Sequence, residues 1–207
     1  MYKTIKQRFM DYINSMPFSP EQQHILDNLK LSHTNRVVGL SETLATSVFS
    51  SNDYLSECIN LAKITALLHD VARWNQMFVY NNFTDIEGDH GEMGADIVLQ
   101  NDMLNGLGEN NKQIILTAIR EHNKKYANSH DEFTQVFVDI IRDADKIDNL
   151  HIEVENYSDK GNSMKNVLPF SDEHRLSPQI YENVMNDTLA DSKDRETKID
   201  FKFFKMI

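Results

Sequence analysis

The sequence predicts an all-α fold, and three observations carry that prediction. Apolar residues recur along most of the chain at a spacing near 3.6, the period of a helix that buries one face. Only 7 glycines and 4 prolines occur among the 207 residues, which disfavours turn-dense β architectures. No run of alternating apolar and polar residues is long enough to seed a sheet. We therefore expect a helical bundle that forms a single domain over residues 1–207.

The first half of the chain contains three predicted helices. Residues 2–15 place apolar side chains at helical spacing and end before two closely spaced prolines. Ser19 followed by Pro20 resembles an N-cap with proline in the first turn, so a long second helix is expected over 20–48. The third helix, over 53–68, is apolar on nearly all sides, and we place it at the centre of the core.

The second half contains five predicted helices separated by polar segments. Asp89 with Glu92 resembles a capping box, which marks the start of one helix. The expected helices of this half cover residues 89–104, 111–122, 132–150, 178–190 and 194–206. The segments expected to be irregular are 73–88, 106–110, 123–131 and 156–177. The chain stops within the apolar stretch 201–207, which is consistent with a clipped C-terminus.

Composition excludes several classes of function. The formal net charge is −11, from 21 basic and 32 acidic residues, which disfavours sequence-independent binding to nucleic acid or to an anionic membrane. No apolar stretch is long enough to span a membrane, and the first ten residues lack the apolar segment of a signal peptide. The single cysteine, Cys58, excludes an intrachain disulfide and a cysteine zinc site. We therefore expect a cytoplasmic protein.

Four of the eight histidines lie beside apolar segments, together with two acidic residues at core-facing positions. Buried imidazole and carboxylate groups are costly unless they are paired or bind a cation. Several imidazoles and carboxylates from different helices are the ligands that a first-row divalent cation prefers. The candidate metal ligands are His33, His69, Asp70, His90, His122 and Asp145.

The His69-Asp70 pair differs from a chance dipeptide by its surroundings. A second pair, His130-Asp131, lies in a polar loop and is interpreted as the chance copy. The predominantly apolar run ITALL directly precedes His69. Adjacent side chains at a helix C-terminus can reach one point only if the backbone turns there. The carboxylate of Asp70 could then bridge two cations while His69 binds one.

Five short strings, in chain order, resemble the HD superfamily of metal-dependent phosphohydrolases. They are SHTNRV, ALLHDVAR, DHGEMGADIV, AIREHNK and IRDADKIDNL, and they contain the candidate ligands in turn. The resemblance implies an all-α bundle of at least five helices. It also implies an HD-like core over about residues 21–150 and a C-terminal helical extension over about 151–207.

The resemblance further implies a ligand set. In the family, one divalent metal is held by the positions that match His33, His69, Asp70 and Asp145. Members with two more histidines, at the positions of His90 and His122, hold a second metal, with Asp70 bridging the two. This binuclear subgroup includes cyclic-dinucleotide phosphodiesterases and hydrolases of dinucleoside polyphosphates. The former often have a His-His pair where this chain has His122-Asn123.

The chemistry of such a centre identifies the basic residues of interest. Two cations about 3.5–4 Å apart lower the pKa of a bridging water and offset charge on a phosphoryl oxygen. Phosphoryl transfer then needs mainly positioning and charge stabilisation from the protein. We expect Arg73 and Lys146 first, and Lys124 next, to bind the phosphate. Asp70, Arg73 and Lys146 are the predicted catalytic residues.

Several of these residues also have a structural interpretation. His33 could be a satisfied core histidine, His90 a helix-start residue, and His122 a cation favoured at a helix C-terminus. Asp145 could form a surface ion pair, although it falls on the buried stripe of its helix. The aromatic residues between 74 and 83 could either line a base-stacking pocket or pack in the core.

The leading functional hypothesis is a phosphomonoesterase or phosphodiesterase that acts on a nucleotide or a related small phosphoester. We expect two divalent metal ions, drawn from Fe, Mn, Co, Ni or Mg. The expected partner is a small phosphorylated substrate, with no nucleic acid and no membrane, and a homodimer is left open. The alternatives are a non-catalytic module that binds metal and nucleotide, and a protein whose metals are purely structural.

Overall fold

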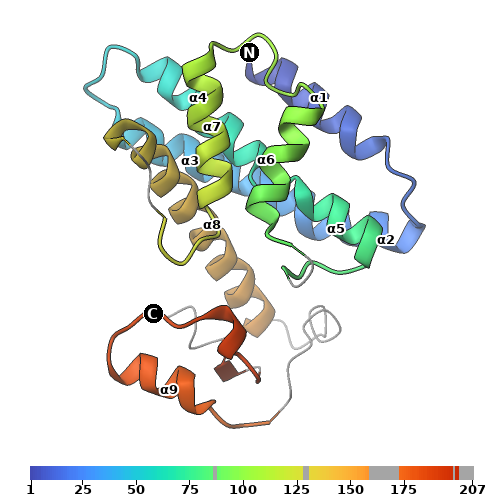
Figure 1. Cartoon of the computed structure of the whole chain (residues 1–207), viewed down its shortest axis with the longest axis vertical. Coiled ribbons are helices and arrows are strands. Elements are labelled where there is room, and N and C mark those ends of the chain that lie inside the picture. The colour runs from blue at the N-terminus through green and yellow to red at the C-terminus, as the bar shows by residue number, and fades with distance from the viewer. Residues whose placement is uncertain (86–87, 128–130, 159–172, 198, 201–207) are drawn as a thin grey trace. The chain divides into compact units, whose positions relative to one another are not determined.

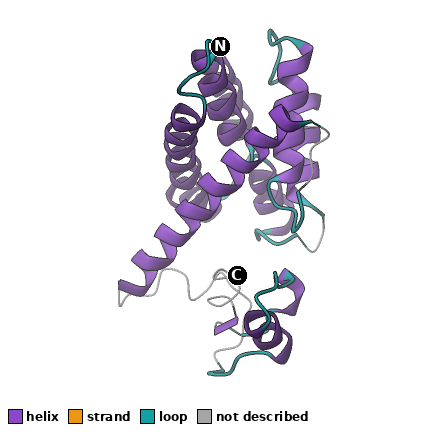
Figure 2. Cartoon of the chain, turned by 90° about the vertical axis from the view of Figure 1, so that its left-hand side faces the viewer, coloured by secondary structure: helices purple, strands orange, loops and turns teal. Residues whose placement is uncertain are grey.

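The computed structural model describes residues 1–85, 88–127, 131–158, 173–197 and 199–200, and within these residues it is helical with no strand (Figure 2). The all-α prediction is therefore confirmed. The α-helices are α1 (Tyr2–Asn14), α2 (Pro20–Ile25), α3 (Ser32–Val48), α4 (Leu55–Leu68), α5 (Ala72–Tyr80), α6 (His90–Gln100), α7 (Glu109–Glu121), α8 (Glu132–Ser158) and α9 (Pro178–Met185). A π-helical turn, η1 (Leu26–Leu31), and a 3₁₀ turn, η2 (Ser192–Asp194), complete the set. None of the described helices is long and apolar enough to cross a bilayer.

The chain divides into two compact units, residues Met1–Asn149 and Leu150–Ile207. The first unit contains α1 to α7 and most of α8 (Figure 1). The expectation of a single domain stays a prediction.

Helix α4 occupies the centre of the first unit, as its apolar composition predicts. It packs against α3, α7 and α1. Its side chains Ile64, Leu67 and Leu68 are almost fully buried. Because α4 is enclosed on several sides, the residues at its C-terminal end lie in the interior and not at the surface.

The predicted helix over 20–48 is helical throughout, but it is not a uniform α-helix. Residues Leu26–Leu31 form a π-helical turn between α2 and α3. The Ser19 capping box and the proline of the first turn are both present, as expected. A π-turn changes the local register of a helix and often occurs at functional sites. Here it carries Lys30 and leads directly into His33.

Residues 73–88 were predicted to be irregular. This prediction is wrong for the first part of the segment, because Ala72–Tyr80 form helix α5. The cause is tertiary packing: the Trp74 ring is buried and contacts the Phe9 ring edge-on, with 5.3 Å between centroids. Helix α5 ends at Asn81, which adopts a left-handed conformation with φ of 53°. Asparagine tolerates this conformation and commonly ends helices. Trp74 is therefore a core residue and not part of a base-stacking pocket.

Other element boundaries differ by a few residues. Helix α6 ends at Gln100 and not near Leu104, and α9 ends at Met185. Helix α8 continues to Ser158, so residues 156–158 are helical and not irregular. Of the last predicted helix, residue 194 belongs to η2, residues 195–197 are not helical, and 198 and 201–207 lie outside the described residues. The predicted irregular residues 159–172 and 128–130 also lie outside them.

In the second unit, the Asp200 carboxylate organises the described part. It accepts hydrogen bonds from the backbone N–H groups of Ser177, Glu196 and Thr197 and from the Ser177 hydroxyl. Burial opposes ionisation of this carboxyl, but the four donors outweigh that effect and lower its pKa to about 2. The hydrogen bonds of Asp200 thus tie the segment before α9 to the residues after η2.

Candidate metal centre

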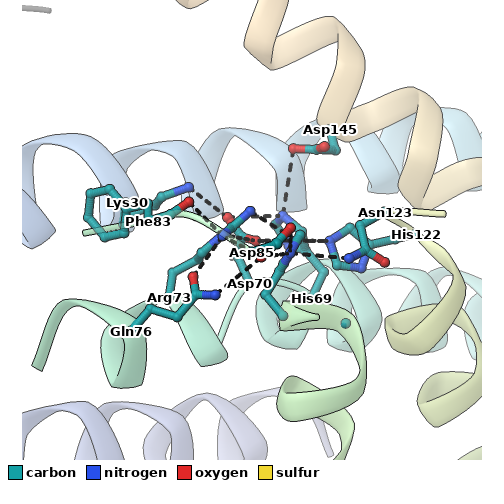
Figure 3. A network of polar contacts seen from close by, with 12 residues as sticks. Lys30, His69, Asp70, Arg73, Gln76, Phe83, Asp85, His122, Asn123 and Asp145 are labelled. Atoms are coloured by element: carbon teal, nitrogen blue, oxygen red, sulfur yellow. Dashed lines mark hydrogen bonds and ion pairs between the residues drawn. The ribbon is translucent and has the colours of Figure 1, made fainter. Parts of the chain in front are cut away.

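The candidate metal ligands converge at one point in the first unit, where five segments of the chain meet (Figure 3). His33 comes from α3 and Asp145 from α8, His90 is the first residue of α6, and His122 caps the C-terminus of α7. His69 and Asp70 lie between the end of α4 at Leu68 and the start of α5 at Ala72. The backbone turns there, so the side chains of His69 and Asp70 face the same point. This is the turn that was expected if both adjacent residues were to reach one cation.

Asp70 lies between two groups of imidazoles. Its Oδ2 is 3.8 Å from Nε2 of His33 and 3.8 Å from Nε2 of His69. Its Oδ1 is 3.4 Å from Nε2 of His90 and 3.9 Å from Nε2 of His122. The carboxylate therefore offers one oxygen to each group, and each group with Asp70 has the arrangement of a metal site. All five side chains are buried.

Asp145 completes the group around His33 and His69. Its Oδ1 lies 3.1 Å from Nε2 of His33 and 3.7 Å from Nε2 of His69. The Asp145 side chain is 24% exposed, whereas the imidazoles are almost inaccessible. Asp145 is therefore the most solvent-accessible of the candidate ligands.

Each of the four imidazoles is oriented by a hydrogen bond from Nδ1. The acceptors are the backbone carbonyl of Ala66 for His69, the carbonyl of Ile119 for His122, Asp148 for His33 and Asp85 for His90, at 2.7–2.8 Å. Carbonyl and carboxylate oxygens only accept hydrogen bonds, so Nδ1 carries the proton. The Nε2 lone pairs are then directed at Asp70 and Asp145, which is the usual arrangement of metal-binding histidines.

Two features of the imidazole Nε2 atoms indicate that these residues fit a cation. His69 Nε2 is buried and has no hydrogen-bond partner among the described residues. His90 Nε2 and His122 Nε2 lie only 3.0 Å apart, although the Nδ1 atoms of both rings are already engaged as donors. Two lone pairs at that distance repel each other unless a proton or a metal ion lies between them. Imidazole nitrogen and carboxylate oxygen together suit first-row divalent cations.

The carboxylates are held in the ionised form. Burial works against ionisation of Asp70, but the charges of Lys30, His69 and Arg73 outweigh it and hold its pKa well below the usual range. The pKa of Asp145 is likewise far below the ordinary value, because the interactions with the His33 and His69 imidazoles outweigh burial. Both carboxylates are therefore available as anionic ligands near neutral pH.

The imidazoles fall into two classes. Burial, with the charges of His90 and His69, lowers the pKa of His122 to about 3, so this ring is neutral. For His33, burial favours the neutral form, but the carboxylates of Asp145 and Asp148 outweigh it and raise the pKa. A metal ion must therefore compete with a proton at His33, and binding there weakens as the pH falls.

A comparison with protein-family models matches the HD domain over residues 31–150, more than half of the chain. The chain belongs to the HD-domain family. This family consists mostly of metal-dependent hydrolases, and its domains bind divalent metals. Neither the curated proteins nor the solved structures yielded a match. The family resemblance inferred from the sequence is therefore confirmed, and the His and Asp clusters of this HD domain lie within the matched region.

The HD-domain site contains outer residues that the sequence reading missed. Asp148, one turn after Asp145, binds Nδ1 of His33 and is itself held by Arg36 through contacts of 2.6 and 3.0 Å. Asp85, in the loop after α5, contacts Nδ1 of His90 at 2.8 Å. The spacing of Asp145 and Asp148 on one helix face was a usable signal. No local pattern marks Asp85, because its position depends on how the loop folds back.

Replacing Asp148 with Asn is expected to weaken Mn²⁺ binding about 10–100-fold, the usual effect of removing an outer carboxylate. The substitution removes the charge that orients His33 and replaces one of the two carboxylate oxygens that Arg36 contacts. Isothermal titration of the metal-free protein with Mn²⁺ measures the change. Asp143→Asn, at an exposed position of the same helix, is the matched control and should bind like the parent protein. Equal Mn²⁺ affinities for the two variants would contradict the role of Asp148 in supporting metal binding through His33.

Arg73 lies inside the site, and its predicted role in binding phosphate stays a prediction. Its Nε is 3.4 Å from Asp70 Oδ1 and its Nη2 is 3.2 Å from His90 Nε2. Nη1 donates to Gln76 Oε1 at 2.7 Å, the Phe83 carbonyl at 2.8 Å and Asp85 at 3.0 Å. The guanidinium is therefore fixed beside both the Asp70 carboxylate and the second group of imidazoles (Figure 3).

The two predicted lysines lie differently. Lys124 donates to Asp89 Oδ2 at 2.6 Å and lies 3.4 Å from Glu92, so it joins the end of α7 to the start of α6. Lys146 is exposed, directly after Asp145 on α8. A lysine that was not predicted, Lys30, reaches Asp70 instead, with Nζ 2.9 Å from Oδ2. The roles of Lys124 and Lys146 in binding substrate stay predictions.

Proposed function

We propose that this HD domain is a metal-dependent phosphohydrolase that acts on a nucleotide or a related small phosphoester, as a phosphomonoesterase or phosphodiesterase. The observation that carries the proposal is the position of Asp70, whose two oxygens face two separate pairs of imidazole Nε2 atoms. A site that only stabilised the fold would not need a carboxylate shared in this way.

Each group of ligands has a defined composition. His33, His69, Asp70 and Asp145 would hold one cation, and Asp70, His90 and His122 a second. The candidates are Fe, Mn, Co, Ni or Mg, since imidazole and carboxylate sites accept several of them. When bound, such cations polarise a phosphoryl group and lower the pKa of water to near neutrality.

The protein's own residues supply positioning and charge. The carboxylate of Asp70 is shared by the two ligand groups and so fixes their relative positions. The Arg73 guanidinium adds a fixed positive charge beside this carboxylate, where it would face the phosphoryl oxygens. Because Arg73 is already held by Gln76, Phe83 and Asp85, little reorganisation is needed when charge develops on a substrate. The proposed partner is a small phosphorylated molecule and not nucleic acid, in keeping with the net charge of −11.

The proposal is tested by loading the full chain with Mn²⁺ or Fe²⁺ and measuring hydrolysis of generic phosphomonoesters and phosphodiesters. A panel of nucleotides, dinucleotides and sugar phosphates then identifies the substrate class. We expect product only from metal-loaded protein, and none from a variant that combines His69→Ala with Asp70→Ala. If nucleotides raise the melting temperature but no substrate is cleaved under any condition, the protein is a binding module and not an enzyme. Unchanged turnover in the double variant would also refute the proposal.

A further inference from the structure

Lys30 is a flexible cation that reaches the centre of the site. Its Nζ lies 2.9 Å from Asp70 Oδ2, the oxygen that also faces His33 and His69. The side chain is only 17% exposed and projects from the π-helical turn directly before α3. The Lys30 ammonium is therefore paired with the same carboxylate oxygen that would bind a cation together with His33 and His69.

The ammonium group also lies beside an aromatic ring at the edge of the site. Nζ is 5.2 Å from the centroid of the Phe83 ring, within the range of a cation–π contact. Figure 3 shows the Lys30 amine between the Phe83 ring and Asp70. The ammonium thus lies beside the centre of the site but can still change its direction, since an aromatic face restrains it less strictly than hydrogen bonds do.

Lys30 differs from Arg73 in how it is held. The Arg73 guanidinium donates to three acceptors besides its contact with Asp70, and it cannot leave without breaking them. Lys30 is held through Asp70 and a ring face. A divalent cation on Asp70 Oδ2 would repel an ammonium at 2.9 Å, because like charges at such short range in a buried site interact strongly. Lys30 must then give up this oxygen.

We propose that Lys30 is a phosphate-binding residue that exchanges Asp70 for the substrate when the metal binds. Released from the carboxylate, its ammonium remains next to the cations, where the group it can pair with is an anionic phosphoryl oxygen. A lysine suits this exchange because its charge is compact and its four-carbon stem is flexible. The inference rests on the proposed function, but it makes two claims that can be measured without turnover.

The test compares Lys30→Met with Lys63→Met. Lys63 is a close match, since its Nζ pairs with Glu42 at 2.7 Å, lies 5.1 Å from the Tyr2 ring and has a side chain 21% exposed. Titration calorimetry measures Mn²⁺ binding to the metal-free chain and inorganic phosphate binding to the Mn²⁺-loaded chain. In Lys30→Met we expect tighter Mn²⁺ binding, because a competing cation is gone. We expect phosphate binding to weaken about 10-fold or more, the usual contribution of a charge-assisted hydrogen bond. Lys63→Met should change neither.

The opposite signs of the two shifts distinguish this role from a structural one. A lysine that only supported the fold would weaken metal and phosphate binding together, and that result overturns the proposal, as does a Lys30→Met variant identical to the parent. If Lys30→Met does not fold, Lys30→Gln must show the same pair of opposite shifts. Should the parent chain bind Mn²⁺ and phosphate but hydrolyse no phosphoester, the proposed enzyme fails while the two binding shifts still decide the role of Lys30.

Discussion

Asp70→Asn is expected to lower the proposed metal-dependent hydrolysis at least about 1,000-fold, since cations at such centres both activate water and stabilise charge in the transition state. The substitution keeps the size of the side chain but removes its charge and one of its two acceptor oxygens. The imidazole pairs on either side would then lose their shared anionic ligand. Lys30 and Arg73 would also remain beside the site without the carboxylate that they pair with. Turnover of the best substrate and metal content per chain measure the two losses.

The matched control for this variant is Asp96→Asn, on an exposed face of α6. It makes the same chemical change far from the ligands and should leave metal content and turnover at the parental level. An Asp70→Asn protein that retains both metal and full turnover would show that the chemistry occurs elsewhere.

Gly91→Ala is expected to destabilise the protein by about 1–3 kcal/mol, the usual cost of forcing extra atoms into a packed interior. A Cβ at this position would lie 2.8 Å from the Arg120 carbonyl, 2.9 Å from the Ile119 carbonyl and 2.8 Å from Asn123 Oδ1. Two of these three atoms are backbone and cannot rotate away, so α6 and α7 must separate. In a chain of this length the melting temperature should fall by roughly 2–12 °C.

The same substitution should also disturb the metal centre. Gly91 follows His90 directly, and the Ile119 carbonyl orients His122 through a contact of 2.7 Å. Mn²⁺ titration should therefore show weaker binding along with the lower melting temperature. Gly39→Ala is the control, because a Cβ there meets no atom within 4 Å. In the middle of α3 it should stabilise the protein by about 0.5–1 kcal/mol. Equal melting temperatures for the two variants would contradict the close packing of α6 on α7.

Local patterns predicted most helices because their signals are short-range. Capping at Ser19 and Asp89 and the apolar stripe of the central helix depend on neighbours within one or two turns. Helix α5 was missed because its stability comes from Trp74 packing against Phe9, which is 65 residues earlier in the chain. The π-turn at 26–31 was missed because a single extra residue per turn leaves the apolar spacing nearly unchanged.

The convergence of the candidate ligands could be predicted because each of them occurs in a recognisable string, and the HD-domain match covers all of them. The surrounding residues were less accessible to sequence reasoning. Lys30 looks like an ordinary solvent-facing lysine until the structure shows its contact with Asp70, 40 residues away. Lys124 was chosen by its proximity to His122, but side-chain direction brought it to Asp89. Proximity in sequence predicts which element a basic residue belongs to, not which anion it contacts.

The single carboxylate between the two pairs of imidazoles would make the two proposed metal positions thermodynamically dependent. A cation held by His33 and His69 would draw charge from the same Asp70 carboxylate that a cation held by His90 and His122 would need. By linkage, whatever factor the first cation imposes on the affinity of the second, the second imposes on the first. Metal uptake by this protein should therefore follow a cooperative or anticooperative isotherm rather than the sum of two independent sites.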